Sequence, residues 1–348
     1  MVMTISTAPI QISDADLEKF RFLRLHPQVS IGTASDRYAG WIGQIYTADR
    51  YRGRISTRTH RVGGRTFKED VLPVESVEEY FEHFEVLEID YTFYAPLIGM
   101  DGSPTQTFQV LKAYRSHLKA GDRIILKVPQ AVTAQKIQRS GRYLPNPGFL
   151  DPELFMRSFF EPSVQLLGPH LVGLIFEQEY QRKDERTPAD ALAKRLDTFF
   201  TAISGDHRCH LELRTESYLS EPVFDVMASH GVGQVLSHWT WLPSLSRQLT
   251  RAGRRFFSSD RQCIIRLMTP RGVRYEDAYA RAHPFGALVE GLFDPRMVED
   301  TLDVLDAAMG QDIHTNLIIN NRSGGNAPHI ARLIAARFRD RRLAGSGS

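Results

Sequence analysis

The fold follows from two short runs, Leu171-Val172-Gly173-Leu174-Ile175-Phe176 and Cys209-His210-Leu211-Glu212-Leu213, which enclose the amphipathic stretch Pro188 to Ile203. Each short run is apolar and has the length of a buried strand, whereas the stretch between them has the apolar spacing of a helix. A strand, a helix and a second strand form the unit that sets two parallel strands into one sheet. Residues 171–213 therefore predict one β-α-β unit.

The same alternation extends from this unit toward both ends of the chain. The other predicted strands are Val29–Ala34, Val86–Tyr91, Arg123–Val128, Gly233–Ser237, Cys263–Met268 and Thr315–Ile319. The other predicted helices are Val74–Phe84, Phe108–Leu118, Pro152–Leu167, Pro222–His230, Leu245–Ala252, Pro295–Met309 and Ala327–Phe338. Eight such units with right-handed crossovers favour closure over an open sheet. We predict an α/β fold, a single-domain (β/α)₈ barrel similar to a TIM barrel.

Residues 1–28 are expected to form an N-terminal extension, 29–340 the barrel, and 341–348 a C-terminal tail. The last residues, Gly345 to Ser348, resemble a cloning remnant. No linker rich in Pro, Gly and Ser divides the chain, which favours one domain. No Gly-x-Gly-x-x-Gly follows the first strand and no Walker-type loop occurs, so a nucleotide-binding open sheet is disfavoured.

Composition limits the classes of partner. The chain of 348 residues has 43 basic and 41 acidic side chains, a near balance that argues against a surface built throughout for nucleic acid. The segment Arg50 to Arg65 holds six arginines, so a local phosphate-binding strip stays open beside a solvated loop. The sequence shows neither a membrane span nor the layout of a signal peptide. Cys209 and Cys263 are interpreted as buried free thiols, and we expect a cytoplasmic protein.

Polar residues occur at nearly every predicted strand end, where active sites of such barrels lie. Charged residues in apolar strands are costly unless they are paired or bind a ligand. Two interpretations follow: a ring of structural ion pairs, or a polar pocket for an anionic small molecule. The residues in question are Glu88, Asp90, Tyr94, Lys127, Glu177, Glu212, Arg214, His238, Arg266 and Asn320.

In the pocket interpretation, Glu88 and Glu212 are the catalytic acid and base. The three cations Lys127, Arg214 and Arg266 bind the anion, because arginine and lysine pair with phosphate and carboxylate. The remaining substrate-binding residues are Asn320, His238, Glu177, Asp90 and Tyr94. We also predict that Glu88, Lys127, Glu212, Arg214, Arg266 and Asn320 converge in one pocket.

Whether the chain is an enzyme stays open at this stage; hydrolysis, elimination and isomerisation all suit paired carboxylates. No metal and no cofactor is expected, since cations among the carboxylates repel a metal ion. Three alternatives remain. One is a metal-dependent hydrolase or isomerase with ligands Glu88, Glu177, Glu212 and His238, another is nucleic-acid binding or processing through Arg50 to Arg65, and the last is a non-catalytic binding module. The sequence does not indicate an oligomeric state.

The motifs at the strand ends also resemble a known family. They are Ile31-Gly32-Thr33-Ala34-Ser35 with Tyr38 and Trp41, Glu88-Ile89-Asp90-Tyr91-Thr92-Phe93-Tyr94, Lys127-Val128-Pro129, Glu212-Leu213-Arg214, Arg266-Leu267 and Asn320-Asn321. In this order, from about Ile31 to Leu333, they resemble the domain of unknown function 72 family, whose members are also called YecE-like proteins. The resemblance implies a TIM-barrel-like fold with a pocket and implies no activity. Asp90 and Thr215 depart from the family's Asn and His.

Overall fold

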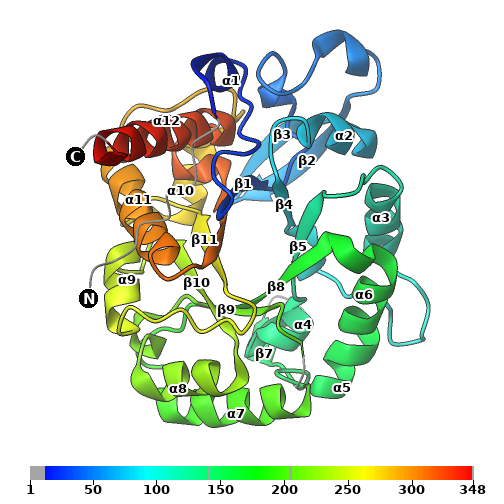
Figure 1. Cartoon of the computed structure of the whole chain (residues 1–348). Coiled ribbons are helices and arrows are strands. Elements are labelled where there is room, and N and C mark those ends of the chain that lie inside the picture. The colour runs from blue at the N-terminus through cyan, green and yellow to red at the C-terminus, as the bar shows by residue number, and fades with distance from the viewer. Residues whose placement is uncertain (1–11, 140–141, 204–205, 347–348) are drawn as a thin grey trace. The chain divides into compact units, whose positions relative to one another are not determined.

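Eight parallel strands build the sheet at the centre of the chain, and they close into a barrel in the order β1-β12-β11-β10-β9-β8-β5-β4. The computed structural model describes residues 12–139, 142–203 and 206–346 (Figure 1). The barrel strands are β1 Val29–Ala34, β4 Val86–Ile89, β5 Arg123–Lys127, β8 Leu171–Gln178, β9 Cys209–Leu213, β10 Gly233–His238, β11 Gln262–Leu267 and β12 His314–Ile319. The predicted (β/α)₈ class is confirmed.

Helices follow the strands and supply the outer layer. The α-helices are α1 Asp14–Glu18, α2 Val77–Tyr80, α3 Gln106–Arg115, α4 Gln130–Thr133, α5 Pro152–Phe155, α6 Glu161–Leu167, α7 Ala189–Ala202, α8 Glu221–His230, α9 Leu245–Arg251, α10 Tyr275–Ala282, α11 Pro295–Met309 and α12 Ala327–Ser346. A π-helical turn, Met156–Phe160, joins α5 to α6. Single 3₁₀ turns occur at Ala39–Trp41, Ala48–Tyr51, Val74–Ser76, Tyr91–Phe93, Gly168–His170, Glu216–Tyr218 and Asn321–Ser323.

The chain divides into two compact units, and the strands of the barrel are distributed over both of them. The first unit holds the described residues of 1–87, 237–246 and 265–348, and the second holds those of 88–236 and 247–264. The first unit thus contains β1 and β12, and the second contains β5, β8 and β9. The limits predicted for the barrel domain, 29–340, stay a prediction.

Aromatic packing in the second unit fixes which face of β8 points outward. The ring of Phe176 lies 5.2 Å from that of Phe155 on α5, and 5.6 Å from those of Phe199 and Phe200 on α7. Phe176 is fully buried by these contacts. Because successive side chains of a strand point to opposite faces, the neighbour Glu177 points away from the helices, toward the barrel interior.

In the first unit a glycine permits a close approach between strands. A Cβ atom on Gly32 of β1 would lie only 1.8 Å from the backbone oxygen of Val86 at the start of β4. No side chain fits at that distance, which explains why the strand carries glycine here.

The structure differs from the sequence expectation most in the segment before residue 74. A solvated loop was one expectation for Arg50 to Arg65, but the segment forms an antiparallel hairpin of β2 Ser56–Val62 and β3 Arg65–Val71. Gly63 and Gly64 connect the two strands, with φ of 56° and 80°, the left-handed conformation that a two-residue hairpin turn requires. A second hairpin, β6 Lys136–Arg139 with β7 Arg142–Pro145, follows α4.

Two predicted element ends also differ. The strand expected to reach Tyr91 ends at Ile89, and a 3₁₀ turn begins at Tyr91. The last helix continues past Phe338 to Ser346. Its Arg341 pairs with three acids of α11, Glu299, Asp303 and Asp306, at 2.9–3.0 Å, and these ion pairs hold the added turns against α11.

Candidate active site at the strand ends

Three charged side chains of the second unit lie on one face at the C-terminal ends of neighbouring strands. Lys127 is the last residue of β5 and is in register with Ile175 of β8. Glu177 lies two residues beyond Ile175 and is in register with Glu212 of β9. Residues two apart in a strand share a face of the sheet. The register therefore places Lys127, Glu177 and Glu212 on the face opposite the aromatic core, which points toward the barrel interior.

These side chains form a chain of ion pairs. One carboxylate oxygen of Glu177, Oε2, lies 2.6 Å from Lys127 Nζ and 2.7 Å from an Nη of Arg214. Arg214 Nε lies 3.5 Å from Glu212 Oε1. The Glu212 side chain is fully buried, whereas 9% of Lys127 and 15% of Arg214 are exposed. One buried carboxylate oxygen thus binds two cations, and both cations are partly exposed to solvent.

The segment after β4 packs against this network. The ammonium of Lys127 lies 3.9 Å from the centre of the Phe93 ring, a cation–π contact, and Thr92 Oγ1 donates a 2.7 Å hydrogen bond to the Lys127 carbonyl. The motif Glu88–Tyr94 therefore contributes to the position of Lys127 through Thr92 and Phe93. Of the predicted site residues in it, Glu88 is fully buried, while 69% of Tyr94 is exposed. Asp90 follows the end of the strand, so strand alternation does not place it beside Glu88.

Sequence reasoning missed one carboxylate of this region, Glu179. Its Oε1 accepts hydrogen bonds from the backbone of Gln135 and the amide of Gln181, both at 2.8 Å. Burial raises the pKa of the Glu179 carboxyl, and the nearby charge of Glu177 adds to this. Glu179 is two residues beyond Glu177 in the sequence but follows Gln178, the last residue of β8, so strand alternation could not have placed it.

Arg266 and Asn320 belong to the first unit. Arg266 is fully buried in β11, and Asn320 directly follows β12. The backbone N–H of Asn320 donates a 2.8 Å hydrogen bond to the carbonyl of Leu267, which sets Asn320 beside the end of β11. Convergence of these two residues with Glu88, Lys127, Glu212 and Arg214 of the second unit stays a prediction.

The next residue, Asn321, has a structural role. Its Oδ1 accepts hydrogen bonds from the Trp41 indole at 3.1 Å and from the backbone of Ala327 at 2.8 Å. The first of these joins the segment after β1 to the segment after β12. Asn321 and Trp41, two of the motif residues quoted above, are therefore connected by a contact that positions the backbone.

His238 ends β10 in the first unit and is only 4% exposed. Its ring lines a pocket of about 340 Å³ together with side chains from the loop after β11 and from α11. Burial lowers the pKa of His238 to about 4, so the ring is neutral at pH 7. The pocket contains several carboxylates, and its chemistry is treated below.

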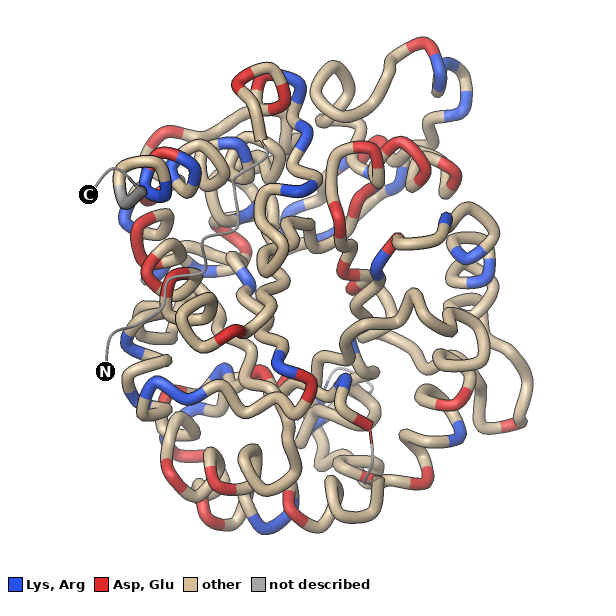
Figure 2. The backbone as a smooth tube through the Cα atoms, in the orientation of Figure 1, with Lys and Arg blue, Asp and Glu red and all other residues tan. Residues whose placement is uncertain are grey.

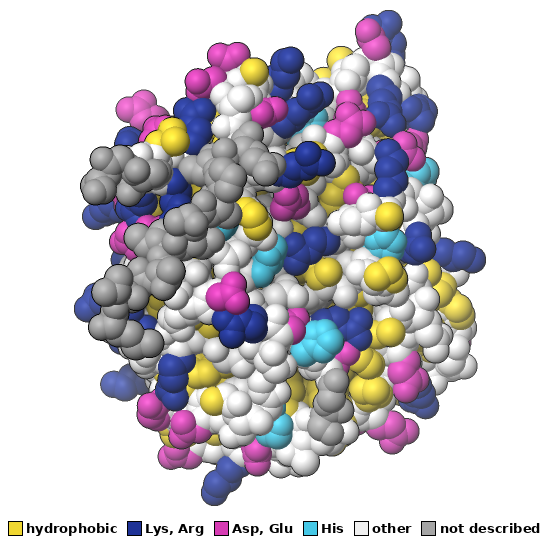
Figure 3. Space-filling view, viewed as in Figure 1, with side chains coloured by type: hydrophobic (Ala, Val, Ile, Leu, Met, Phe, Trp, Pro, Cys, Tyr) yellow, Lys and Arg dark blue, Asp and Glu magenta, His cyan; other side chains and the backbone are white. Residues whose placement is uncertain are grey.

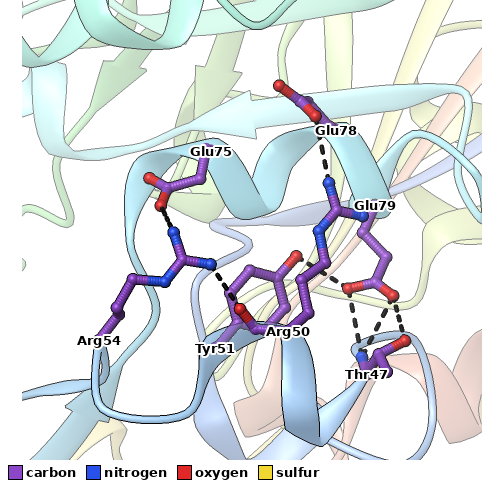
Figure 4. Close-up of polar contacts among 7 residues, drawn as sticks. All are labelled: Thr47, Arg50, Tyr51, Arg54, Glu75, Glu78 and Glu79. Atoms are coloured by element: carbon purple, nitrogen blue, oxygen red, sulfur yellow. Dashed lines mark hydrogen bonds and ion pairs between the residues drawn. The ribbon is translucent and has the colours of Figure 1, made fainter.

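The arginines of the segment Arg50 to Arg65 are mostly paired with acids (Figure 4). Arg50 contacts Glu78 at 3.1 Å and Arg54 contacts Glu75 at 2.5 Å, both on the segment after the hairpin. The other two pairs are Arg52 with Asp49 and Arg58 with Glu69. In Figure 3 the dark-blue side chains over this part of the first unit accordingly lie among magenta ones. Four of the six arginines are thus already neutralised, which weakens the basis for a phosphate-binding strip.

Other expectations can be compared with the structure. Cys209 and Cys263 are buried free thiols, as predicted, and burial raises the pKa of both, that of Cys263 to about 12. Within residues 12–139, 142–203 and 206–346, no three His, Cys, Asp or Glu side chains are arranged to hold a metal ion. Glu177 and Glu212, two of the ligands considered for a metal, instead contact cations. No helix in the described part of the chain is long and apolar enough to cross a membrane.

The architecture defines a class: a (β/α)₈ barrel protein with buried, ion-paired charges at the C-terminal ends of its strands. Comparison with known proteins gives the family. The model of the family described as protein of unknown function DUF72 matches residues 30–346. The chain therefore belongs to the DUF72 family, and the resemblance drawn from its motifs is confirmed.

Solved structures of this family share the fold. A DUF72 family protein from Enterococcus faecalis is 14% identical, with a TM-score of 0.54 over 90% of this chain and 95% of that one. A DUF72 family protein from Thermotoga maritima is 13% identical, with a TM-score of 0.53 over 90% of this chain and 98% of that one. At these identities the likeness extends to the fold alone. Among curated proteins, none matches the chain.

Proposed function

We propose that this protein is an enzyme that acts on a phosphorylated or otherwise acidic small molecule at the C-terminal ends of β5, β8 and β9. The observation that carries the proposal is the pair of cations, Lys127 and Arg214, held by one buried oxygen of Glu177. Two cations this close repel each other. Glu177 and Glu212 balance the two charges, and both cations are partly exposed, so the anionic group of a ligand can reach them. An anionic group is the ligand that such a pair of cations binds.

The residues then take distinct roles. Lys127 binds the anion with the N–H donors that it does not give to Glu177, since an ammonium has three. Arg214 supplies the planar fork that suits phosphate or carboxylate. Glu88 and Glu212, both fully buried, form the acid/base pair. Glu179, whose pKa burial raises, is a further candidate for the proton donor.

The proposal keeps four of the other predicted binding residues and leaves His238 to the separate pocket described below. Arg266 and Asn320, at the ends of β11 and β12, would extend the anion site, and Asp90 and Tyr94 would contact the rest of the substrate. Such a site needs no metal for hydrolysis, elimination or isomerisation, because carboxylates move the protons. Buried free thiols at Cys209 and Cys263 fit a cytoplasmic location, which we include in the proposal.

A ligand screen with a matched pair of variants tests the proposal. The full chain is screened against phosphates, sugar acids and nucleotides by thermal shift, and each hit is assayed for turnover. Lys127→Met should abolish the shift, whereas Lys136→Met, which removes a lysine from an exposed pair with Glu185, should leave it unchanged. Glu212→Gln should retain binding and lose turnover.

Each outcome has a defined meaning. If no member of the library moves the melting temperature, the anion site is refuted. Binding without turnover of any hit would indicate a non-catalytic binding module and would refute the enzyme. A gel shift with DNA or RNA that weakens steeply as salt rises would instead support nucleic-acid binding, for which the paired arginines of residues 50–65 give little support.

A further inference from the structure

The pocket beside His238 lies wholly within the first unit and is separate from the residues proposed for catalysis. It measures about 340 Å³, a volume suited to a small ligand. His238 comes from the end of β10, Ser244 from the loop that follows it, and Arg271 from the loop after β11. The remaining wall comes from residues 294–303 at the start of α11. In a barrel of this class these positions belong to the C-terminal side, where ligands bind.

His238 is the polar group in this pocket that lacks a partner. The side chain is 4% exposed, and both ring nitrogens are buried without a hydrogen-bond partner among the described residues. Leaving a buried polar atom unpaired is unfavourable, so native structures rarely keep one without a functional reason. With a pKa lowered to about 4 by burial, the neutral ring has one nitrogen that accepts a hydrogen bond.

The rest of the lining is acidic. Four carboxylates, Asp294, Glu299, Asp300 and Asp303, face two guanidiniums, those of Arg271 and Arg296. Figure 2 shows acidic residues recurring along α11, which carries three of the four. The charges of Asp300 and Asp294 act on His238 in the direction that favours a proton on its ring. Burial, the largest effect, and the charge of Arg271 act the other way and lower the pKa of the ring, so the ring stays neutral while the two carboxylates attract a cationic ligand.

The two arginines do not turn the pocket into an anion site. Arg296 is 91% exposed, and both its Nε and an Nη donate to Asp294, at 3.1 Å each. Arg271 donates from Nε to the backbone oxygen of Leu242 at 3.1 Å. Arg296 is thus neutralised by Asp294, and Arg341 of α12 pairs with Glu299 and Asp303. Asp300 accepts hydrogen bonds from the backbone N–H groups of Leu245 and Ser246 and pairs with no arginine among the described residues, so its charge is left for a ligand.

We propose that this pocket binds a small molecule that carries a primary ammonium group. The ammonium donates one N–H to the neutral ring of His238, which supplies the partner that the ring lacks. The carboxylate of Asp300 compensates its charge, and the buried side chain of Met297 contacts the carbon chain. The site differs from the proposed anion site in its unit, its residues and its charge, so either proposal can fail without the other.

The test uses three probes of matched length and different charge: 1,4-diaminobutane, succinate and 1,4-butanediol. Binding to the full chain is measured by calorimetry, and the imidazole signals of His238 are followed by long-range ¹H–¹⁵N NMR after assignment with His238→Gln. The diamine should shift the His238 signals and bind at least tenfold more tightly than the diol. Succinate should not bind there.

Variants separate the contribution of the ring from that of the acids. His238→Gln should weaken diamine binding about tenfold, and Glu299→Gln, at a side chain that is 54% exposed, about threefold. Asp190→Asn on α7 of the second unit is the matched charge control and should change nothing. The proposal is overturned if the diamine leaves the His238 signals in place, if succinate binds as tightly, or if Asp190→Asn weakens binding as much as Glu299→Gln.

Discussion

The chain contains two Lys–Glu pairs with the same contact distance and different burial, and they allow a direct test of the ion-pair network. Lys127–Glu177 and Lys136–Glu185 both have N···O distances of 2.6 Å. The first pair has side chains that are 9% and 6% exposed, and the second has side chains that are 37% and 47% exposed. Glu177→Gln and Glu185→Gln are therefore matched perturbations that differ in burial and in the second cation, Arg214, that Glu177 contacts.

Glu177→Gln leaves Lys127 and Arg214 facing each other without the negative charge between them. Removing one partner of a buried ion pair costs about 3–5 kcal/mol, and we expect about 3 here because an amide oxygen still accepts one hydrogen bond. Unfolding entropy of about 2.1 cal/mol/K per residue over 348 residues converts this into a melting temperature lower by about 4 °C. Glu185→Gln should cost less than about 1 kcal/mol.

Urea denaturation of both variants and the parent, followed by circular dichroism, gives the free energies of unfolding. A double variant, Lys127→Met with Glu177→Leu, removes both charges and should recover more than half of the loss, since a well-packed apolar pair avoids desolvation. If Glu177→Gln and Glu185→Gln destabilise equally within about 0.5 kcal/mol, Glu177 does not bridge buried cations and the proposed anion site loses its basis.

Three further predictions concern the core and the buried titratable groups. Phe176→Ala should cost about 3–5 kcal/mol in urea denaturation, because a fully buried ring among three others leaves a cavity; a loss below 1 kcal/mol would contradict the packing of β8. In the folded protein the pKa of His238 is about 4, below its ordinary value of 6.5. Between these two pH values the unfolded chain binds a proton at His238 and the folded chain does not, so the free energy of unfolding falls as pH drops from 6.5 to 4. The decrease should be roughly 3 kcal/mol in the parent and absent in His238→Gln. If the free energy of unfolding depends on pH in the same way in both proteins, a buried neutral ring is excluded. Cys209 and Cys263 should stay unmodified by a thiol reagent at pH 8 in the native chain and react fully in denaturant, and rapid native labelling would show that they are accessible.

Local sequence was informative where short-range patterns decide the structure. The predicted limits of β1, β9 and α11 agree with the structure, because each run has the length and apolar spacing typical of its element type. The hairpin of β2 and β3 was missed although Gly63-Gly64 is a signal for a two-residue turn. Its strands are mostly exposed and rich in arginine, so no apolar alternation marked them.

Pairing between distant residues was not available from the sequence. The order of the motifs placed Lys127, Glu177 and Glu212 at the same end of the barrel, since parallel strands share their C-terminal edge. That one oxygen of Glu177 serves both Lys127 and Arg214 depends on register and side-chain rotamers. The same holds for Arg50 and Arg54. The sequence left them open as phosphate-binding residues, but in the structure they pair with Glu78 and Glu75 of the segment after the hairpin.

The sequence by itself determined the barrel, the family and the edge at which polar groups gather, because hydrophobic period and motif order are properties of the chain. Tertiary structure alone decided the charge around each group. His238 was predicted from its strand position to bind substrate, and the side chains that share its pocket, among them Arg271, Asp294 and Asp300, lie more than thirty residues further along the chain. Electrostatic surroundings depend on distance in space, and a sequence pattern specifies only distance along the chain.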